Sequence, residues 1–193
     1  MTCVSYAVEG WGVGEVWHDG ARLVWHELPR PLAEPLPGPR ARARVRPRET
    51  PSQGGVKHPP PSRSTITANR SRVRNVSAPK LEQLVHRLRA YFAGERVDFV
   101  EIEIDVEGWT PFQRDVLAAL RCVRYGEVVS YAELARLAGR PRAQRAAGTF
   151  CSRNRFPLVV PCHRVVSSDG LGSYGELGLD YKRRLLALEG VTL

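Results

Sequence analysis

The segment between residues 29 and 79 constrains the fold of this chain more than any other feature. Proline is frequent throughout it, arginine occupies every second position from Arg40 to Arg48, and large apolar side chains are sparse. Such a segment cannot bury enough apolar surface to offset the entropy that the chain would lose on ordering. We therefore predict a disordered or polyproline-like linker, with folded structure on either side of it.

The same segment carries the whole net charge of the protein. Residues 30–79 contain 11 Lys and Arg against 2 Asp and Glu, whereas the rest of the chain contains 18 of each kind, so the excess of +9 lies here. We expect either a weak attraction to phosphate groups or a solvated loop without a function. A nucleic-acid surface on the folded part would have to come from local clustering of basic residues.

The composition also narrows the class and the compartment. With 193 residues, the chain fits one domain or two small ones. It shows no secretory signal and no apolar run near the roughly 18 residues of a membrane span. Its four cysteines match no zinc-module spacing, which favours free thiols in a reducing compartment. We expect a protein of the cytoplasm, or of the nucleus in a eukaryote, without a membrane partner.

Residues 1–105 predict a small β-rich domain with one helix. Alternating side chains indicate strands at 4–8, 14–18 and 22–26, the last two joined by a turn. Apolar residues at helical spacing from Leu81 to Phe92 indicate a helix. Renewed alternation at residues 97–104 indicates a further strand.

Residues 106–193 predict a mostly helical second domain. Capping boxes open helices at 110–123 and 130–138, and Pro141 is expected to open a third helix that completes a helix-turn-helix. Residues 158–160 are expected to form a short buried strand at the active site. The first helix is expected to bury Phe112, Val116, Leu120 and Cys122. The expected fold class is therefore mixed α/β (α+β).

The helix pair is the most basic part of this second domain. Residues 131–155 contain six arginines against the single acid Glu133, a net charge of +5. Such a cluster suits phosphate contacts and insertion into the minor groove. Ala146 and its small neighbours would let the third helix approach a partner closely. The alternative is a solvated face with a structural role only.

Cys162 is the candidate nucleophile because His163 follows it directly. An imidazole beside a thiol can take its proton and generate the thiolate. Neighbouring residues on a strand point to opposite faces, so contact between the two would need a turn or a bridging water. A buried cysteine that serves packing alone is the alternative.

Residues 161–166 read Pro-Cys-His-Arg-Val-Val. This stretch resembles the active-site motif of the O6-alkylguanine-DNA alkyltransferases, also called methylated-DNA–protein-cysteine methyltransferases. The resemblance covers residues 79–193 and includes Phe112-Gln113, Gly126–Tyr131, Leu134-Ala135, Ala138-Gly139, Arg145-Ala146, Asn154, Gly172–Tyr174 and Leu185–Gly190. The N-terminal strands resemble the smaller domain of that family more loosely.

The resemblance implies a role for each matching residue. Cys162 would accept the alkyl group of O6-alkylguanine, and of O4-alkylthymine, in one irreversible transfer. His163 would deprotonate it through a water, and Glu189 would orient the imidazole. Asn154 would hold the turns that shape the site. Tyr131 would lie at the phosphate of the target nucleotide and donate a proton toward the leaving guanine.

The resemblance also implies how DNA would be held. The helix pair would dock in the minor groove, and Arg145 would fill the place of the flipped base. Further DNA contacts would come from Arg142, Ala146 and Arg153. The pocket would be lined by Tyr174, Lys182, Pro161 and Val165. We expect a monomer that acts on double-stranded DNA containing O6-alkylguanine, with no obligate protein partner and neither a metal nor another cofactor.

Three departures from the family pattern touch the pocket wall and leave the tolerated alkyl size open. Leu117 replaces a tryptophan, the loop between Cys162 and Tyr174 is about one residue short, and residues 175–178 replace a run of glycines. Some relatives bind zinc in the smaller domain. Here only isolated residues could be proposed as ligands, namely Cys3, His18 and His26.

Three other functions remain open at this point. Alkyltransferase-like proteins bind lesions but lack the acceptor cysteine, so the presence of Cys162 favours the enzyme. A helix-turn-helix regulator would use self-alkylation only as a signal. A cysteine hydrolase would turn over and would not depend on duplex DNA.

Overall fold

The computed structural model describes residues 1–31 and 78–193. Three antiparallel strands form the N-terminal sheet in the order β1 (Thr2–Val8), β2 (Gly12–His18) and β3 (Leu23–Arg30). The three predicted strands are confirmed. The predicted linker at 29–79 lies largely outside the described residues, but Pro29 and Arg30 belong to β3, so the strand continues into its first residues.

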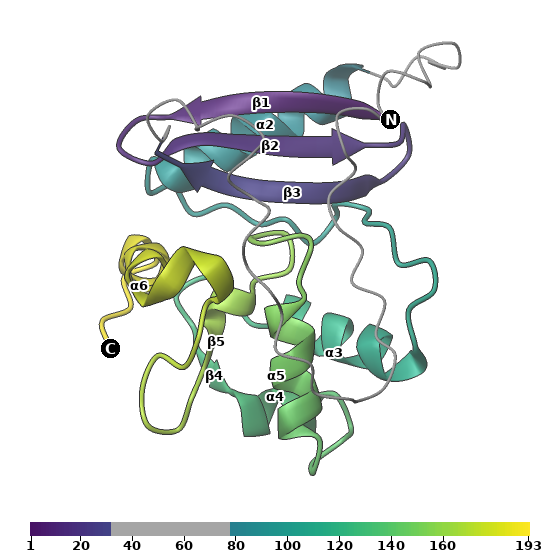
Figure 1. Ribbon diagram of the computed structural model, residues 1–193, viewed down its shortest axis with the longest axis vertical. Coiled ribbons are helices and arrows are strands. Elements are labelled where there is room, and N and C mark those ends of the chain that lie inside the picture. Colours follow the sequence, from purple (N-terminus) through teal and green to yellow (C-terminus); the bar gives the residue numbers. More distant parts are fainter. Residues whose placement is uncertain (32–77) are drawn as a thin grey trace, which may run out of the picture.

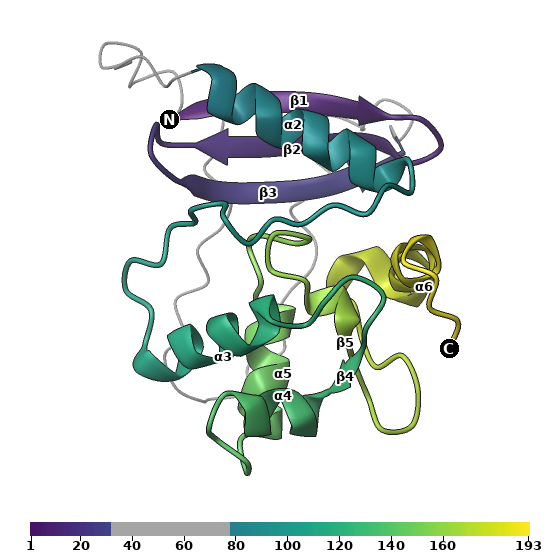
Figure 2. The same ribbon diagram turned by 180° about the vertical axis from the view of Figure 1, so that it is seen from behind.

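One helix, α2 (Ala78–Phe92), lies along the sheet, as seen from behind in Figure 2. Alternate residues of β1 are exposed, so the strand turns one face to solvent and the other inward. Tyr6 and Val16 from the sheet and Leu84 and Leu88 from the helix belong to one buried apolar cluster. The predicted helix is confirmed, and its apolar spacing explains the face that it buries.

The predicted strand at 97–104 is wrong. The chain touches β3 there at a single bridge between Leu23 and Ile104, where the backbone N–H of Leu23 donates to Glu103 O at 2.8 Å. Before this bridge the chain bends, because the Asp98 carboxylate accepts from the N–H of Val100 at 2.9 Å. This local turn replaces the hydrogen bonds that residues 97–104 would make in a β-sheet, so their alternating side chains do not lie on a strand.

The second region consists mainly of helices below the sheet (Figure 1). Helix α3 (Pro111–Arg121) and helix α4 (Tyr131–Leu137) begin at the predicted capping boxes. Helix α5 (Gln144–Ser152) begins three residues after the predicted start at Pro141, because residues 141–142 form a turn. Cys122 is exposed rather than buried, since α3 ends at Arg121 and leaves it as the C-cap.

The predicted strand at 158–160 is also wrong. These residues are buried but form a tight turn, in which the N–H of Val160 donates to Phe156 O at 2.7 Å. Leu158 takes a left-handed φ of 68°, which costs a residue with a Cβ roughly 1–3 kcal/mol. The turn feeds directly into the 3-10 helix η3 (Cys162–Arg164).

The last part of the chain forms a short parallel strand pair and the C-terminal helix. Strand β5 (Val165–Val166) pairs in parallel with β4 (Val129–Ser130), and η4 (Gly175–Leu177) leads into α6 (Gly178–Leu188). The mixed α/β fold with a small sheet beside the active site is therefore confirmed. No helix in residues 1–31 and 78–193 is long and apolar enough to cross a membrane.

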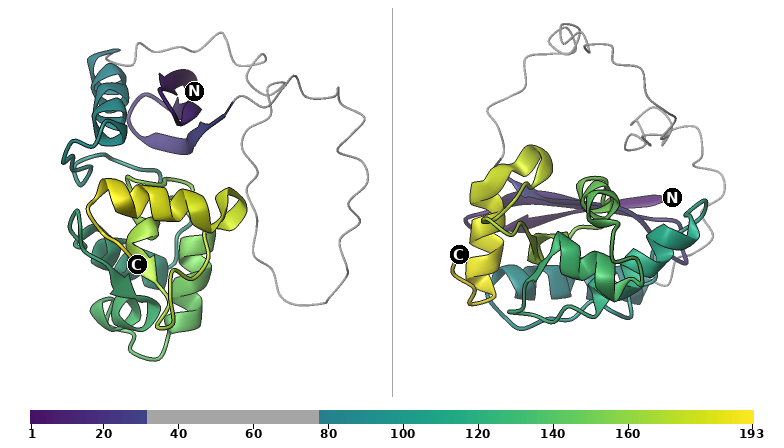
Figure 3. Two further views of the ribbon diagram at one scale, coloured as in Figure 1. Left: turned by 90° about the vertical axis from the view of Figure 1, so that its left-hand side faces the viewer. Right: turned by 90° about the horizontal axis from the view of Figure 1, so that it is seen from below.

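Direct contacts join the N-terminal sheet to the helical region, which lie one above the other in Figures 1 and 3. The ring of His26 shares hydrogen bonds with Tyr6 Oη at 2.6 Å and with Pro157 O at 2.7 Å. The Tyr181 hydroxyl donates to Pro29 O at 2.8 Å. The division into two domains at residue 105 stays a prediction.

Candidate active site

Cys162 is a buried thiol, 7% exposed, at the first position of η3. Its sulfur accepts a hydrogen bond from Nδ2 of Asn154 at 3.0 Å. The same amide donates to Val160 O at 2.8 Å and accepts from the N–H of Phe156 at 2.9 Å. Asn154 therefore holds the turn that leads into the site and also contacts the sulfur.

His163 is fully buried and contacts a carboxylate. Its Nε2 lies 2.8 Å from Oε1 of Glu189, the C-cap of α6. The guanidinium of Arg164 donates to both oxygens of the same carboxylate, at 2.9 Å from Nε to Oε2 and 2.9 Å from Nη2 to Oε1. The remaining ring nitrogen, His163 Nδ1, is buried and has no hydrogen-bond partner among the described residues.

The pKa shifts of Cys162 and His163 favour a protonated thiol and a neutral imidazole. Burial raises the pKa of the Cys162 thiol and lowers the pKa of the His163 imidazole. Burial also opposes the charge on Glu189, but the hydrogen bonds from His163 and Arg164 outweigh it and hold the pKa of that carboxyl well below its usual range. Glu189 is therefore a carboxylate at neutral pH, and it can fix the proton of His163 on Nε2.

Three further predicted residues surround the thiol. Tyr131 begins α4, and its hydroxyl lies against Gly172, where an added Cβ would come within 3.3 Å of it. Burial raises the pKa of Tyr131, which keeps its proton in place. Burial and the nearby Cys162 raise the pKa of Tyr174 well above its usual value. Lys182 is buried and donates to Val165 O and Leu171 O, so it fastens β5 to the following loop.

The two remaining residues of the predicted pocket lie next to the thiol in the chain. Pro161 is the N-cap of η3, and Val165 pairs with Val129 across the two strands. Leu117, one of the departures from the family pattern, packs partly buried against the core.

The predicted DNA contacts lie on and beside α5 and leave their side chains free for a partner. Arg142, Arg145, Ala146 and Arg153 are all exposed. Helices α4 and α5 pack directly on each other, as the helix-turn-helix prediction requires. Arg142, Arg145 and Arg153, called the basic patch below, therefore face solvent, whereas the thiol of Cys162 is buried.

Two residues of the site were not predicted to have a role. Arg164 lies inside the recognised motif, but its hydrogen bonds to Glu189 are tertiary contacts that the spacing of residues in the sequence does not reveal. Tyr91 comes from α2, and its hydroxyl donates to Glu189 Oε1 at 2.8 Å. In the sequence it only continues the apolar stripe of that helix, so it looks like an ordinary core residue.

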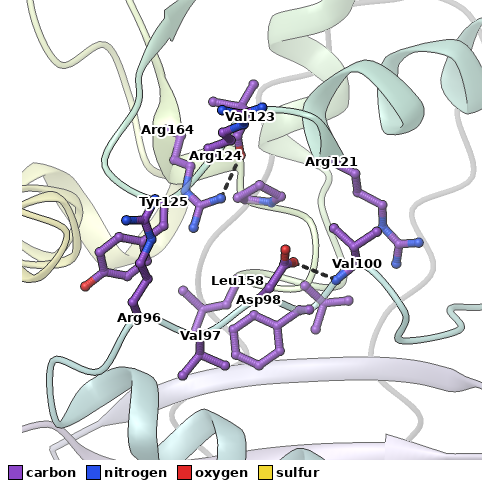
Figure 4. Close-up of a pocket in the computed structure, with 13 residues that line it drawn as sticks. Arg96, Val97, Asp98, Val100, Arg121, Val123, Arg124, Tyr125, Leu158 and Arg164 are labelled. Atoms are coloured by element: carbon purple, nitrogen blue, oxygen red, sulfur yellow. Dashed lines mark hydrogen bonds between the residues drawn. The ribbon is translucent and has the colours of Figure 1, made fainter.

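A pocket of about 410 Å³ lies beside Arg164 (Figure 4). Arg96, Tyr125, Pro161 and Arg164 are among its lining residues, and the guanidinium of Arg164 donates from Nη1 to Val123 O at 2.8 Å. Cys162 does not line this pocket. The thiol therefore does not open into this pocket.

The three residues considered as zinc ligands do not form a metal site. Both ring nitrogens of His26 are held, one by Tyr6 and one by Pro157. His18 accepts through Nδ1 from the N–H of Gly20 at 2.9 Å. Within the part of the chain that the structure describes, no group of three His, Cys, Asp or Glu side chains could hold a metal ion.

Comparisons with known proteins identify the family. Residues 111–191 match the model of the 6-O-methylguanine DNA methyltransferase DNA-binding domain, and residues 62–106 match that of the ribonuclease-like domain of the same proteins. A methylated-DNA–protein-cysteine methyltransferase of Mycolicibacterium paratuberculosis is 50% identical over 106 residues, 54% of this chain. That match spans 62% of the relative, less than two thirds of its length.

The matches to two more relatives span larger shares of the relatives' own length. A methylated-DNA–protein-cysteine methyltransferase of Methanopyrus kandleri is 45% identical over 112 residues, which is 57% of this chain and 81% of the relative. The crystal structure of the Mycobacterium tuberculosis alkyltransferase in complex with DNA is similar with a TM-score of 0.66 and 30% identity. It covers 97% of this chain and 92% of that one. The fold, the motif around Cys162 and these matches together show that the chain belongs to the O6-alkylguanine-DNA alkyltransferase family.

Proposed function

We propose that this protein repairs alkylated DNA by transferring the alkyl group of O6-alkylguanine, and of O4-alkylthymine, to Cys162 in a single irreversible event. One observation carries the proposal. Cys162 is buried and accepts a hydrogen bond from Asn154, and the next residue, His163, contacts Glu189, in a chain of a family whose members are named for this reaction. The alternative of a lesion-binding protein without transfer has no such reason to retain a thiol in this position.

The chemistry suits the residues. His163 takes the proton of Cys162 on Nδ1, through a bridging water, and Glu189 stabilises the imidazolium that forms. The thiolate attacks the alkyl carbon in line with the carbon–oxygen bond, a carbon–sulfur bond forms, and the electron pair of the broken bond goes to guanine O6. The thioether cannot be hydrolysed, so the protein is consumed.

The leaving guanine needs a proton, and Tyr131 is the proposed donor. Its raised pKa keeps the hydroxyl protonated beside the thiol. The proton on His163 then returns through water to the Tyr131 phenolate. In the net change one hydrogen moves from the thiol to guanine and the alkyl group moves from guanine to sulfur. No other reactant is consumed.

The DNA would be bound through α4 and α5. The target atom lies inside the duplex, so the base has to leave the stack at a cost of a few kcal/mol. Arg145 is proposed to enter the stack in its place, since it is exposed near the start of α5. Arg142, Arg153 and the small side chain of Ala146 would let this surface approach the backbone closely. A relative from Mycobacterium tuberculosis was solved in complex with DNA.

We further propose a monomer that acts in the cytoplasm without an obligate protein partner. The curated relatives come from bacteria and archaea, whose DNA lies in the cytoplasm. Pro161, Val165, Tyr174 and Lys182 would form or support the wall of the alkylguanine pocket.

The proposal is tested by counting repair events per protein molecule. A duplex carrying O6-methylguanine is titrated with the protein, and the remaining lesion is measured. We expect one lesion lost for each protein, and none with Cys162→Ala. Multiple turnovers would overturn the single-event mechanism in favour of a hydrolase. Lesion-specific binding with no loss of the methyl group would favour the lesion-binding alternative.

A further inference from the structure

Tyr91 brings a phenol from the N-terminal half of the chain to the centre of the candidate active site. It lies on α2, 72 residues before His163, and its side chain is fully buried. Its hydroxyl lies 2.8 Å from Glu189 Oε1 and 3.3 Å from His163 Nε2. Tyr91 therefore touches both members of the pair that is proposed to activate the thiol.

The hydrogen bonds around Glu189 determine which neighbouring groups act as donors and which nitrogen of His163 carries the proton. Oε1 is shared by His163 Nε2, the Tyr91 hydroxyl and Arg164, and Oε2 accepts from Arg164 and from the N–H of Gly126 at 3.1 Å. Because Glu189 is a carboxylate, it can only accept, so the Tyr91 hydroxyl and His163 Nε2 both act as donors. The proton of the neutral imidazole then lies on Nε2, and Nδ1 keeps its lone pair.

The surroundings of Tyr91 hold its ring in this position. The rings of Phe99, Tyr125 and His163 lie 6.1–6.3 Å from it between centroids, and the ring of Phe92 lies at 5.5 Å. These aromatic contacts leave the ring little freedom to turn away. Burial also raises the pKa of Tyr91 well above its usual value, so the hydroxyl stays a donor.

We propose that Tyr91 is a positioning residue, which holds the Glu189 carboxylate so that His163 presents Nδ1 as the base for Cys162. The inference rests on the proposed alkyl transfer to Cys162. Tyr91 does not touch the sulfur in this arrangement and acts through Glu189 and His163. The N-terminal part of the chain thereby contributes to the reactivity of the thiol through Glu189 and His163.

The inference predicts a change in pH dependence. The groups that act on His163 are Glu189 at the end of α6, Tyr91 on α2, Arg164 on η3 and Lys182 on α6. Tyr91→Phe removes one donor from Glu189 and leaves more negative charge to stabilise the protonated imidazole. The pKa of His163 should therefore rise, so that the base becomes available only at higher pH.

The experiment compares single-turnover methyl transfer and iodoacetamide alkylation of Cys162 across pH for the wild type and Tyr91→Phe. We expect Tyr91→Phe to slow both reactions about tenfold near neutral pH, because Glu189 would no longer hold His163 with Nδ1 toward the thiol. Tenfold is the size expected for one lost hydrogen bond to a charged group. The acidic limb of both pH profiles should move up by about half a pH unit, worth roughly 0.7 kcal/mol. Affinity for an unmodified duplex should not change.

Tyr125→Phe is the matched control. Its ring lies 6.1 Å from that of Tyr91, but its hydroxyl donates to the carbonyl of Leu188 at 2.7 Å instead of to a carboxylate. We expect the acidic limb of this variant to stay at the wild-type pH. Thermal unfolding of each variant verifies that it is folded under the assay conditions.

The outcomes separate this inference from the proposed function. Unchanged rates and profiles in folded Tyr91→Phe would overturn the role of Tyr91 and leave methyl transfer intact. An equal shift in Tyr125→Phe would also overturn it, because the effect would then be a general one. If the wild type fails to take methyl from DNA, the proposed function fails, while iodoacetamide alkylation still tests the link between Tyr91 and the thiol.

Discussion

At the scale of single residues, Asn154 shows how one amide can serve both the fold and the reaction. It caps the turn with its carbonyl oxygen and its Nδ2, and the same Nδ2 contacts the sulfur of Cys162. A hydrogen bond from a neutral donor stabilises a developing thiolate without fixing it permanently in the charged form. The side chain therefore lowers the cost of deprotonation in a site where burial raises it.

We expect Asn154→Asp to slow methyl transfer about tenfold or more at neutral pH, because a carboxylate beside the sulfur raises the pKa of Cys162. The rate should recover partly as pH rises. Single-turnover rates across pH measure both effects. Ser152→Asp is the control, since it adds the same charge at an exposed position at the end of α5. An equal loss in the two variants would show that charge near α5, not the contact with sulfur, matters.

Arg145 is a second single residue with a proposed role, in binding DNA rather than in the reaction of the thiol. We expect Arg145→Ala to impair repair in duplex DNA much more than reaction with free O6-benzylguanine, because only the duplex requires a base to be flipped. The ratio of the two rates is the measurement. Arg183→Ala, an exposed arginine on α6, should leave the ratio unchanged. An equal loss in both reactions would exclude the proposed insertion into the stack.

The same scale shows where prediction from sequence ends. The residues around Cys162 could be predicted because a contiguous motif carries them. Tyr91 could not be predicted, because a tyrosine among the apolar residues of a helix has the pattern of a core residue. The role of Arg164 also depends on the contact with Glu189, 25 residues further along the chain. Such tertiary contacts leave no trace in local spacing.

At the scale of elements, local hydrogen bonds determine whether a sequence pattern forms the helix or strand that it predicts. Helices α3 and α4 begin where predicted because both capping boxes form, at Thr110–Gln113 and Ser130–Glu133. The alternating residues 97–104 fail to form a strand because Asp98 caps a local turn instead. The buried apolar run at 158–160 forms a turn closed by the bond from the N–H of Val160 to Phe156 O. The sequence did not reveal this, because periodicity alone does not distinguish buried conformations.

Helix α5 gives the prediction that belongs to this scale. Ala146 is exposed on it, amid the basic patch. We expect Ala146→Glu to weaken binding to duplex DNA at least tenfold, since a longer acidic side chain would meet the phosphate backbone. The free energy of unfolding should change by less than about 0.5 kcal/mol, as is usual at an exposed position.

Fluorescence anisotropy with a labelled duplex, together with urea denaturation, measures the two quantities. Ala187→Glu places the same change on an exposed position of α6, and it should leave the affinity near that of the wild type. Equal affinities for Ala146→Glu and the wild type would show that α5 does not face DNA.

At the scale of the whole molecule, His26 joins the N-terminal sheet to the turn that precedes the active site. Burial lowers the pKa of His26 from 6.5 to about 4. As pH falls, the unfolded chain therefore takes up this proton before the folded one, and stability that is fully present above pH 6.5 is lost toward pH 4. The linkage amounts to about 3 kcal/mol at most, for a shift of 2.5 pH units.

We expect the free energy of unfolding to decline through this pH range and His26→Gln to show a shallower decline from a lower starting value. The buried His163, whose pKa is also lowered, leaves a residual slope in the variant. Urea denaturation across pH measures the slopes. A wild-type stability independent of pH between 6.5 and 4 would contradict the buried, neutral state of His26.

The central claim is that Cys162 itself takes the alkyl group. The most direct measurement is the intact mass of the protein after incubation with a duplex carrying O6-methylguanine, followed by peptide mapping. The account predicts a gain of one methyl group, located on Cys162, with the lesion restored to guanine. An unchanged mass with the lesion still present, or a methyl group on another residue such as Cys151, would contradict it.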